Sequence, residues 1–294
     1  MTNFAILAIG GITPMVSLCL DSIRHFKDVK IHIMTEEHNF EAFCSYGLET
    51  DISINLIKSP HSNSKVLQNS KTSEANYEVY GTNRFAQINV LKWTLILEVL
   101  KVIDKNDNLV FSDFDVIWFK EPETSLWKLE PSTIFAQSEW QKVNDVKFCS
   151  GIIGLVKSKE NEAIFADLLA FHQLRLKALN GNYFDQQAFN DFFSEPKLQK
   201  RVKKLSPESF VIGAEIPKYL LRSRRNIYAI HANYLKGQKR KLVVMQALTV
   251  YLNAPKSRIV AALFTQTLLT EGRFTVFLDK CLERVRIKFQ TRAR

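Results

Sequence analysis

Two acidic residues interrupt an otherwise apolar run, and their spacing suits the binding of a cation. The run "NLVFSDFDVIWFKEP" covers residues 108–122, with Asp113 and Asp115 at its centre and apolar residues on both sides. Ionised carboxylates are rarely buried without a partner, so we expect these two to face something positive. Two carboxylates with one residue between them can share a divalent cation, and oxygen ligands suit Mg²⁺ or Mn²⁺. A turn with two solvated acids is the alternative interpretation.

The elements around this pair would place it at the edge of a sheet. Apolar or alternating stretches predict strands at 4–10, 29–34, 52–57, 108–112, 133–138, 151–157 and 226–231. Helical spacing predicts helices at 15–26, 37–46, 85–102, 160–179 and 184–193. This order predicts an α/β fold with a mostly parallel sheet flanked by helices. Because ligands in open α/β sheets bind outside the carboxyl ends of strands, we expect the two acids to line a cleft.

Composition excludes several classes of protein. The chain has 294 residues, 46% hydrophobic and 24% charged, as in ordinary globular domains. Its four cysteines form no CxxC pair, which argues against a disulfide framework and a structural zinc site and favours a reducing compartment. The uncharged stretch 4–20 contains two glycines and a proline and is short for a membrane span, so we interpret it as a strand, a loop and a helix start.

The charge and the polar stretches indicate where partners would bind. The formal net charge is +10, and basic clusters at 220–226, 236–241 and the C-terminus favour anionic partners such as nucleotide phosphates, nucleic acid or acidic lipid. Residues 59–80 are polar and lack periodicity, which predicts a long loop. Variable segments of this kind, together with the C-terminal helices, are where we expect acceptor specificity to reside.

Four segments follow one another along the chain: "NRFAQINVLKWTLILEVLK" leading into the acidic run, "FCSGIIGLVKS", "FDQQAFN" and "IHANYLKGQKRK". In this order and spacing, over residues 83–241, they resemble nucleotide-diphospho-sugar-dependent glycosyltransferases of the GT-A type. The likeness is greatest to the family of plant α-xylosyltransferases and arabinosyltransferases, glycosyltransferase family seventy-seven. A more distant likeness is to the galactosyltransferases of family eight.

The resemblance implies a fold and an activity. The GT-A fold, a Rossmann-like and mostly parallel sheet flanked by helices, would cover residues 1–253, and a basic helical extension would follow at 254–294. The enzyme would move a hexosyl or pentosyl group from a UDP- or GDP-linked donor to a glycan or lipid-linked acceptor, as in polysaccharide or lipopolysaccharide biosynthesis. Related families retain the anomeric configuration of the donor, either through an enzyme nucleophile or through departure and attack on one face.

The resemblance also implies which residues hold the metal and the diphosphate. Asp115 would bind Mn²⁺ or Mg²⁺ directly, and Asp113 would contact the metal or the ribose. His231 would supply a later ligand through a neutral imidazole nitrogen, although a lone histidine at a strand end is more often a satisfied structural one. Either Lys239 or Lys241 would contact the diphosphate as a point charge, with a solvated basic loop as the alternative.

Further residues would contact the nucleotide. Ala8 and Ile9 would offer backbone groups to the base at the end of the first strand. Arg84 would contact the nucleotide or a phosphate, although a residue at a helix start can be merely exposed. Gly237 belongs to the segment that would close over the diphosphate.

The donor sugar would lie against two other motifs. Asp185 and Gln186 would face the sugar as the catalytic pair, although Asp185 could instead be a helix N-cap. Ser150 and Gly151 would allow close approach of the backbone to the sugar, with a tight strand entry as the alternative.

The sequence departs from the family in two ways. One concerns the phosphate contact and the other concerns the expected location. The histidine segment lacks the Lys-Pro-Trp ending of the distant relatives, which leaves its phosphate contact open. No N-terminal membrane anchor precedes the domain, unlike in the Golgi members, which favours a bacterial or viral enzyme in the cytoplasm. We expect the basic C-terminal helices to contact the inner face of an anionic membrane, where a lipid-linked acceptor would lie.

Two rival classes share part of the pattern. Phosphatases of the haloacid dehalogenase type also have D-x-D after an apolar strand. Their motif lies near the chain start, with Thr or Val two residues after the second acid, where this chain has Ile117. A nucleic-acid-binding protein would explain the charge, but the sequence has no helix-turn-helix, zinc finger or RNA-binding motif, so we expect no nucleic acid partner.

Overall fold

The computed structural model describes residues 1–50, 53–60, 83–123, 132–139, 147–216, 227–233 and 238–253. Several sequence predictions fall outside these residues. They are the loop 59–80 beyond its first two residues, the basic cluster 220–226, Gly237 and the C-terminal extension 254–294.

The described strands form one large sheet and one small sheet. The large sheet has seven strands in the order β3-β2-β1-β4-β7-β6-β8. All are parallel except β7, which runs antiparallel to β4 and β6. The bounds are β1 Thr2–Leu7, β2 Val29–Thr35, β3 Ile54–Lys58, β4 Asn108–Ser112, β6 Ile134–Ser138, β7 Phe148–Val156 and β8 Val202–Lys204. The predicted α/β fold with a mostly parallel sheet is confirmed.

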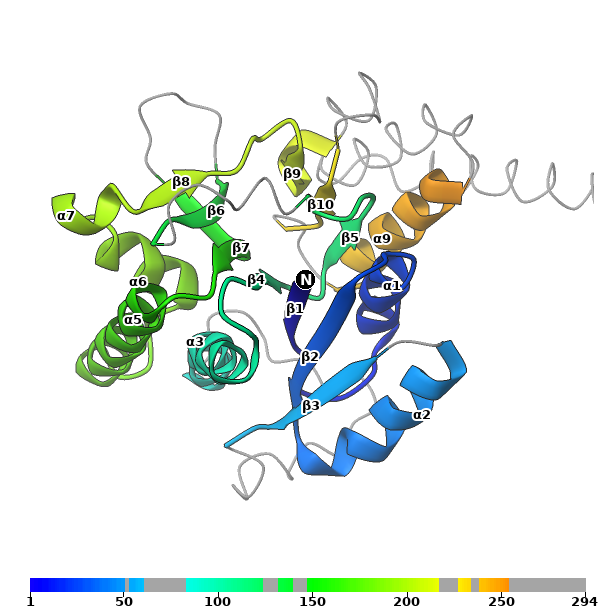
Figure 1. Cartoon of the computed structure of the whole chain (residues 1–294), viewed down its shortest axis with the longest axis horizontal. Helices are drawn as coiled ribbons and strands as arrows, with labels where there is room; N and C mark the ends of the chain where they lie inside the picture. The colour runs from blue at the N-terminus through cyan, green and yellow to red at the C-terminus, as the bar shows by residue number, and fades with distance from the viewer. Residues whose placement is uncertain are drawn as a thin grey trace, which may run out of the picture.

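Helices cover both faces of this sheet (Figure 1). One face carries α3, α5 and α6, and the other carries α1, α2 and α9. Their bounds are α1 Pro14–Ile23, α2 Phe40–Thr50, α3 Asn83–Val102, α5 Lys159–Ala178, α6 Asp185–Phe192 and α9 Gln238–Asn253, with the short α7 at Pro196–Gln199. The sequence predicted each of the helices α1, α2, α3, α5 and α6, with ends that differ by a few residues.

The buried strands explain why continuous apolar runs predicted this sheet. Strands covered on both faces need apolar side chains at every position. Phe4 and Ile6 of β1 pack in the core on the α1 side, whereas Ala5 packs in the core on the α3 side. In β4, Val110 belongs to the first core and Phe111 to the second.

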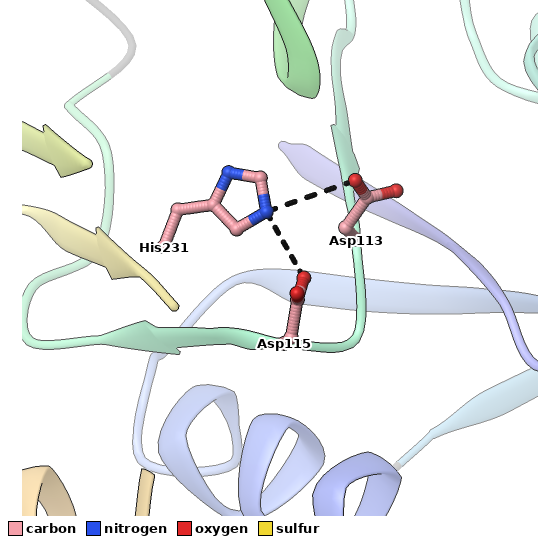
Figure 2. A group of neighbouring side chains, drawn as sticks. All are labelled: Asp113, Asp115 and His231. Atoms are coloured by element: carbon pink, nitrogen blue, oxygen red, sulfur yellow. Dashed lines mark ion pairs between the residues drawn. The ribbon is translucent and has the colours of Figure 1, made fainter. Parts of the chain in front are cut away.

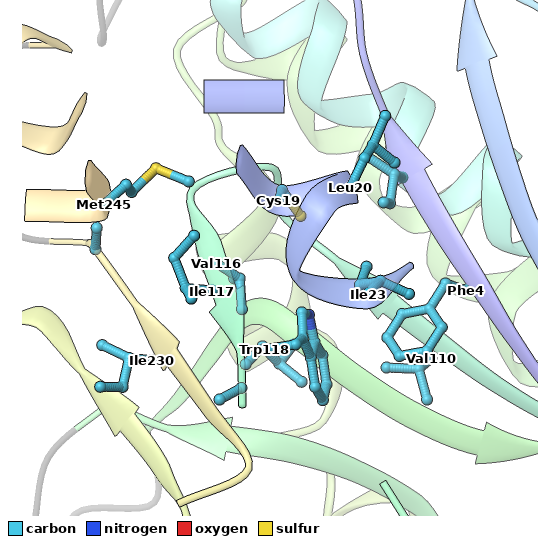
Figure 3. Packing of buried hydrophobic residues seen from close by; sticks show 14 of the residues in the cluster. Phe4, Cys19, Leu20, Ile23, Val110, Val116, Ile117, Trp118, Ile230 and Met245 are labelled. Atoms are coloured by element: carbon cyan, nitrogen blue, oxygen red, sulfur yellow. The ribbon is translucent and has the colours of Figure 1, made fainter. Parts of the chain in front are cut away.

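A small second sheet was not predicted. Its order is β5-β10-β9, with bounds Val116–Trp118, Ala229–His231 and Phe210–Ile212. Strands of three residues are too short to show a period of two, so only the strand that ends at His231 was expected. Figure 3 shows β5 lying beside α1, with Trp118 close to Ile23 and Met245 of α9 nearby.

The two sheets meet beside the acidic pair. Strand order along the large sheet reverses at β1, which has β2 on one side and β4 on the other. Ligands in such sheets bind at the carboxyl ends of the strands next to this reversal. β4 ends at Ser112, and after three residues the chain enters β5 of the small sheet. The acidic pair therefore lies in the turn between the sheets.

Candidate metal centre

Asp113, Asp115 and His231 converge at the carboxyl end of β4 (Figure 2), and we call them the metal cluster. One ligand atom from each lies within 4.8 Å of the other two. His231 Nε2 is 3.0 Å from Asp115 Oδ1 and 3.8 Å from Asp113 Oδ2. Antiparallel pairing of β5 with β10 sets Val116 opposite His231, which brings the histidine beside the preceding aspartate.

The backbone fixes both acids in this position. The Asp113 N–H donates a 2.8 Å hydrogen bond to the carbonyl of Gly151 on β7. The carbonyl of Asp115 accepts a 2.8 Å hydrogen bond from the N–H of Ala232, the residue after β10. The backbone of each acid is therefore hydrogen-bonded to a residue in or next to a strand that is distant from it in sequence.

Gly151 leaves the space that the cluster occupies. A Cβ atom on Gly151 would lie 2.1 Å from Cε1 of His231 and 2.9 Å from Oδ2 of Asp113. No side chain fits there without displacing the histidine ring. The close approach of the backbone to the sugar at this residue stays a prediction, and the structure adds a close approach to the metal cluster.

Opposite charges compensate the buried acid Asp115. Burial would raise the pKa of Asp115, but the Lys241 ammonium and His231 outweigh that effect and hold the pKa well below its usual range. Lys241 Nζ lies 2.6 Å from Asp115 Oδ2. Burial would lower the pKa of His231, yet the Asp115 carboxylate outweighs it and raises the pKa to about 10. With only protein charges present, His231 therefore carries a proton that compensates the acids.

The donor set fits a divalent cation. Two carboxylates and one imidazole suit Mn²⁺, and also Mg²⁺ through the oxygens. A proton and a metal ion are alternatives at the same Nε2 lone pair, because metal binding requires the neutral imidazole. The three side chains therefore form a candidate binding site for a divalent cation.

A second charged group adjoins the first, and we call Lys92, Ser150 and Asp185 the lysine cluster. The Lys92 Nζ donates hydrogen bonds to the Ser150 carbonyl at 3.1 Å, the Ser150 hydroxyl at 3.3 Å and the Asp185 carboxylate. It also lies 3.2 Å from Oδ1 of Asp113, so the two clusters share that ion pair. Burial would lower the pKa of Lys92, but Asp113 and Asp185 outweigh it and raise the pKa.

Lys92 was missed as a site residue. Its side chain is only 4% exposed, and it emerges from the middle of α3 between Leu91 and Trp93. A lysine within the buried stripe of a helix was the available signal, because lysine is almost never fully buried unless it is paired.

Asp185 faces this lysine and is the first residue of α6, not its N-cap. The N-cap of α6 is Phe184, and no side chain caps it. Asp185 Oδ2 accepts a 2.7 Å hydrogen bond from the hydroxyl of Ser150 in addition to the bond from Lys92. Burial would raise the pKa of Asp185, but the nearby ammonium outweighs it and lowers the pKa, so the carboxylate is ionised at neutral pH.

Another missed residue docks α6 on β7. Asn190 accepts a hydrogen bond from the Phe148 N–H and donates one to the Phe148 carbonyl, both at 2.8 Å. Its amide also donates to the carbonyl of Gln186 at 2.7 Å. Gln186 itself is half-buried in the first turn of the helix. The amide of Asn190 thereby holds the predicted catalytic pair against the strand that carries Ser150.

The remaining predicted residues lie in several elements around the clusters. Lys241 contacts Asp115, whereas Lys239 is exposed in the first turn of α9. Arg84 is half-buried in the first turn of α3. The Ala8 N–H donates to the Met34 carbonyl at 3.0 Å and its carbonyl accepts from the Thr35 hydroxyl at 2.8 Å, so the fold uses these backbone groups. Ile9 follows, half-buried, before two glycines with positive φ.

Comparisons with known proteins show the same fold. The glycosyltransferase GlyE of Streptococcus pneumoniae has a TM-score of 0.52 at 13% identity, over 91% of this chain and 64% of that one. The galactosyltransferase LgtC, solved with donor and acceptor sugar analogues, has a TM-score of 0.56 at 12% identity, over 85% of this chain and 95% of that one. The GT-A architecture predicted from sequence is confirmed.

Three further findings come from the helices of the structure and from the sequence comparisons. Across the described residues, no helix is both long enough and apolar enough to span a bilayer. No curated protein sequence matches this chain. The family model of the nucleotide-diphospho-sugar transferases matches residues 53–245, more than half of the sequence, and the chain therefore belongs to that family.

Proposed function

We propose that the protein is a metal-dependent glycosyltransferase that moves a sugar from a nucleotide-diphosphate donor to a glycan or lipid-linked acceptor with retention of configuration. The observation that carries the proposal is that Asp113, Asp115 and His231 converge where the strand order of the large sheet reverses. The chain that forms this sheet belongs to the nucleotide-diphospho-sugar transferases. These three side chains would hold Mn²⁺ or Mg²⁺. When bound, the cation would neutralise the diphosphate and stabilise charge on the leaving group.

The residues around the cation site bind and orient the diphosphate. Lys241 already contacts Asp115, and its side chain is 29% exposed, so its ammonium can also reach a phosphate at the same edge. We assign it the point-charge contact that the sequence left open between Lys239 and Lys241. Arg84, Ile9 and Gly237 stay candidates for the nucleotide. Ala8 stays one only through a further hydrogen bond to its carbonyl, because the fold already uses its N–H and carbonyl.

The lysine cluster would orient Asp185 beside the donor sugar. Lys92 and Ser150 both donate to the same oxygen of Asp185, which fixes the orientation of that ionised carboxylate. A fixed anion beside the donor sugar can attack the anomeric carbon, or it can stabilise positive charge there while the acceptor attacks on one face. Gln186, next in the chain, would contact the same sugar.

The narrower assignments rest on sequence likeness. The motif order supports glycosyltransferase family seventy-seven, with family eight more distant, and a UDP- or GDP-linked hexose or pentose as donor. We also propose that residues 1–253 form the catalytic domain and that the basic extension 254–294 contacts anionic membranes. Failure of the full chain to sediment with anionic vesicles at moderate salt would rule that contact out.

Thermal unfolding tests the proposed function. We expect UDP- or GDP-sugars to raise the Tm only when Mn²⁺ is present, because a ligand that binds only the folded state stabilises it. Asp115→Asn should abolish that shift while leaving a folded protein. The configuration of the product, read by NMR, tests retention. A nucleotide-sugar shift that is equal with and without Mn²⁺, and equal in Asp115→Asn, would refute the proposal.

A further inference from the structure

Gln137 is a fully buried amide that joins the two sheets on the side of His231 away from the acids. It lies on β6, where the pairing register with β7 shifts between Ala136 and Gln137. Irregularities of this kind re-aim a side chain. Here the amide reaches from the large sheet to β9 and β10 of the small one.

The contacts of this amide determine which end is which. One terminal atom lies 3.2 Å from the carbonyl oxygens of both Phe210 and Val211. Carbonyl oxygens only accept hydrogen bonds, so that atom must be the NH₂ group, Nε2. The other terminal atom is therefore the carbonyl oxygen Oε1, and it lies 2.9 Å from Nδ1 of His231.

A carbonyl oxygen facing Nδ1 requires a hydrogen on that nitrogen. We propose that Gln137 is a positioning residue that keeps the hydrogen of His231 on Nδ1 and so directs the Nε2 lone pair at the cation between Asp113 and Asp115. The inference rests on the proposed function, since it concerns the same metal site. Partners of the outer ring nitrogen commonly set the orientation of metal-binding histidines.

The neighbouring thiol does not replace this acceptor. Cys149 Sγ lies 3.6 Å from Nδ1 of His231, but it also accepts a 3.4 Å hydrogen bond from the side-chain amide of Asn233. Sulfur is a weak acceptor compared with an amide oxygen. The oxygen of Gln137 is thus the strong partner of the Nδ1 hydrogen.

Gln137 also connects the two sheets, so the test must separate positioning from structure. Gln137→Met and Gln137→Glu both remove the NH₂ group and leave the Phe210 and Val211 carbonyls without that donor. Only Gln137→Glu keeps an oxygen that can accept from Nδ1. The two variants therefore share the loss of the donor and differ in the acceptor. Because Gln137→Glu also places a buried carboxylate beside the two carbonyls, the Tm of each variant is measured with its affinity.

The affinity for Mn²⁺ alone, and for Mn²⁺ with UDP or GDP, would be measured from the free Mn²⁺ signal in electron paramagnetic resonance. We expect Gln137→Met to bind Mn²⁺ roughly 10- to 100-fold more weakly than the parent chain, and Gln137→Glu to recover most of the loss. In NMR spectra of the Mg²⁺-loaded proteins, the Nδ1 hydrogen of His231 should resonate at the low field of a strongly hydrogen-bonded proton in the parent and in Gln137→Glu, and should move upfield in Gln137→Met. A His231→Gln spectrum assigns the signal.

Three outcomes would overturn the inference. Equal affinity in all three proteins would show that the acceptor does not matter. Equal losses of Mn²⁺ affinity in the two variants, with parallel decreases in Tm, would show that Gln137 only connects the two sheets. An Nδ1 hydrogen that resonates at the same field in Gln137→Met as in the parent would exclude a strong hydrogen bond from His231 to Gln137. If the parent chain and Asp115→Asn both bind no Mn²⁺, the proposed function itself fails and the role of Gln137 falls with it.

Discussion

The metal cluster and the lysine cluster are joined by the ion pair of Lys92 with Asp113, but they obtain their positive charge in different ways. The lysine cluster contains its own cation, since Lys92 is 4% exposed and contacts both Asp113 and Asp185. The metal cluster depends on a proton at His231 and on Lys241, which reaches in from α9 and is 29% exposed. The charges of the lysine cluster balance without a ligand. In the metal cluster, a bound cation can replace the proton on His231.

This difference has a functional consequence. The buried ammonium of Lys92 contacts both Asp113 and Asp185, so we expect the two acids to keep their positions whether or not a cation is bound. The proton on His231 and the ammonium of Lys241 are the charges that we expect a cation to replace. We therefore expect damage to the lysine cluster to lower stability and damage to the metal cluster to lower ligand binding.

The largest expected effect is that of Lys92→Met. Removing a buried cation leaves Asp113 and Asp185 without it, and breaking such a pair typically costs about 3–5 kcal/mol of unfolding free energy. Lys241→Met is the matched control, and we expect about 1 kcal/mol or less because its side chain is partly exposed. Urea unfolding at pH 7 measures both. Equal losses would contradict the division between the clusters.

Gly151→Ala tests the cluster through its packing. The new Cβ would meet the ring of His231, so we expect an activity loss of roughly 100-fold, as for the loss of a well-placed catalytic contact, and a stability loss of about 1–3 kcal/mol. Steady-state transfer assays and urea unfolding measure the two effects. In a His231→Ala background the same change should cost less stability, because the ring is gone. An equal loss of stability in that background would show that the new Cβ strains a part of the structure other than the His231 ring.

A histidine without an acid in contact sharpens the comparison. His32 on β2 is buried between the side chains of Asn3 and Asn55, with each ring nitrogen 3.0 Å from an amide. Burial, with a smaller contribution from Lys30, lowers its pKa to about 4, the opposite direction to His231. A neutral amide environment thus keeps the imidazole neutral, and a carboxylate environment keeps it charged.

This shift predicts a pH dependence of stability. The folded state binds the proton of His32 less well than the unfolded state, so stability falls as the pH drops from about 6.5 towards 4. Relative to His32→Gln, the parent chain should lose about 2 kcal/mol of unfolding free energy between pH 7 and pH 5. Denaturant unfolding of both proteins across that range measures the difference. A pH-independent difference between the two would show that the histidine titrates normally.

The sequence predicted the large sheet, apart from its three-residue edge strand β8, and the acidic pair for local reasons. Continuous apolar runs identify buried strands such as β1 and β4, and the acids follow directly on the end of β4. Two strands of the small sheet, β5 and β9, and the roles of Lys92 and Gln137 were not predicted in the same way. Strands of three residues carry no measurable period, and both side chains meet their partners only through tertiary packing. The candidate site was therefore predictable where chain neighbours or the family resemblance indicate a residue, as for His231, and not where tertiary packing alone does, as for Gln137.

The smallest expected effect separates two lysines that sequence alone could not. Lys241 contacts Asp115, whereas Lys239 is exposed on the same helix turn. If Lys241 also contacts the diphosphate, Lys241→Met should raise the KM for the donor about 10-fold, the equivalent of ~1.4 kcal/mol. Lys239→Met has the same change in charge and should alter the KM by no more than about twofold, as expected for an exposed charge. The reverse order would move the phosphate contact to Lys239 and leave Lys241 as a partner of Asp115 alone.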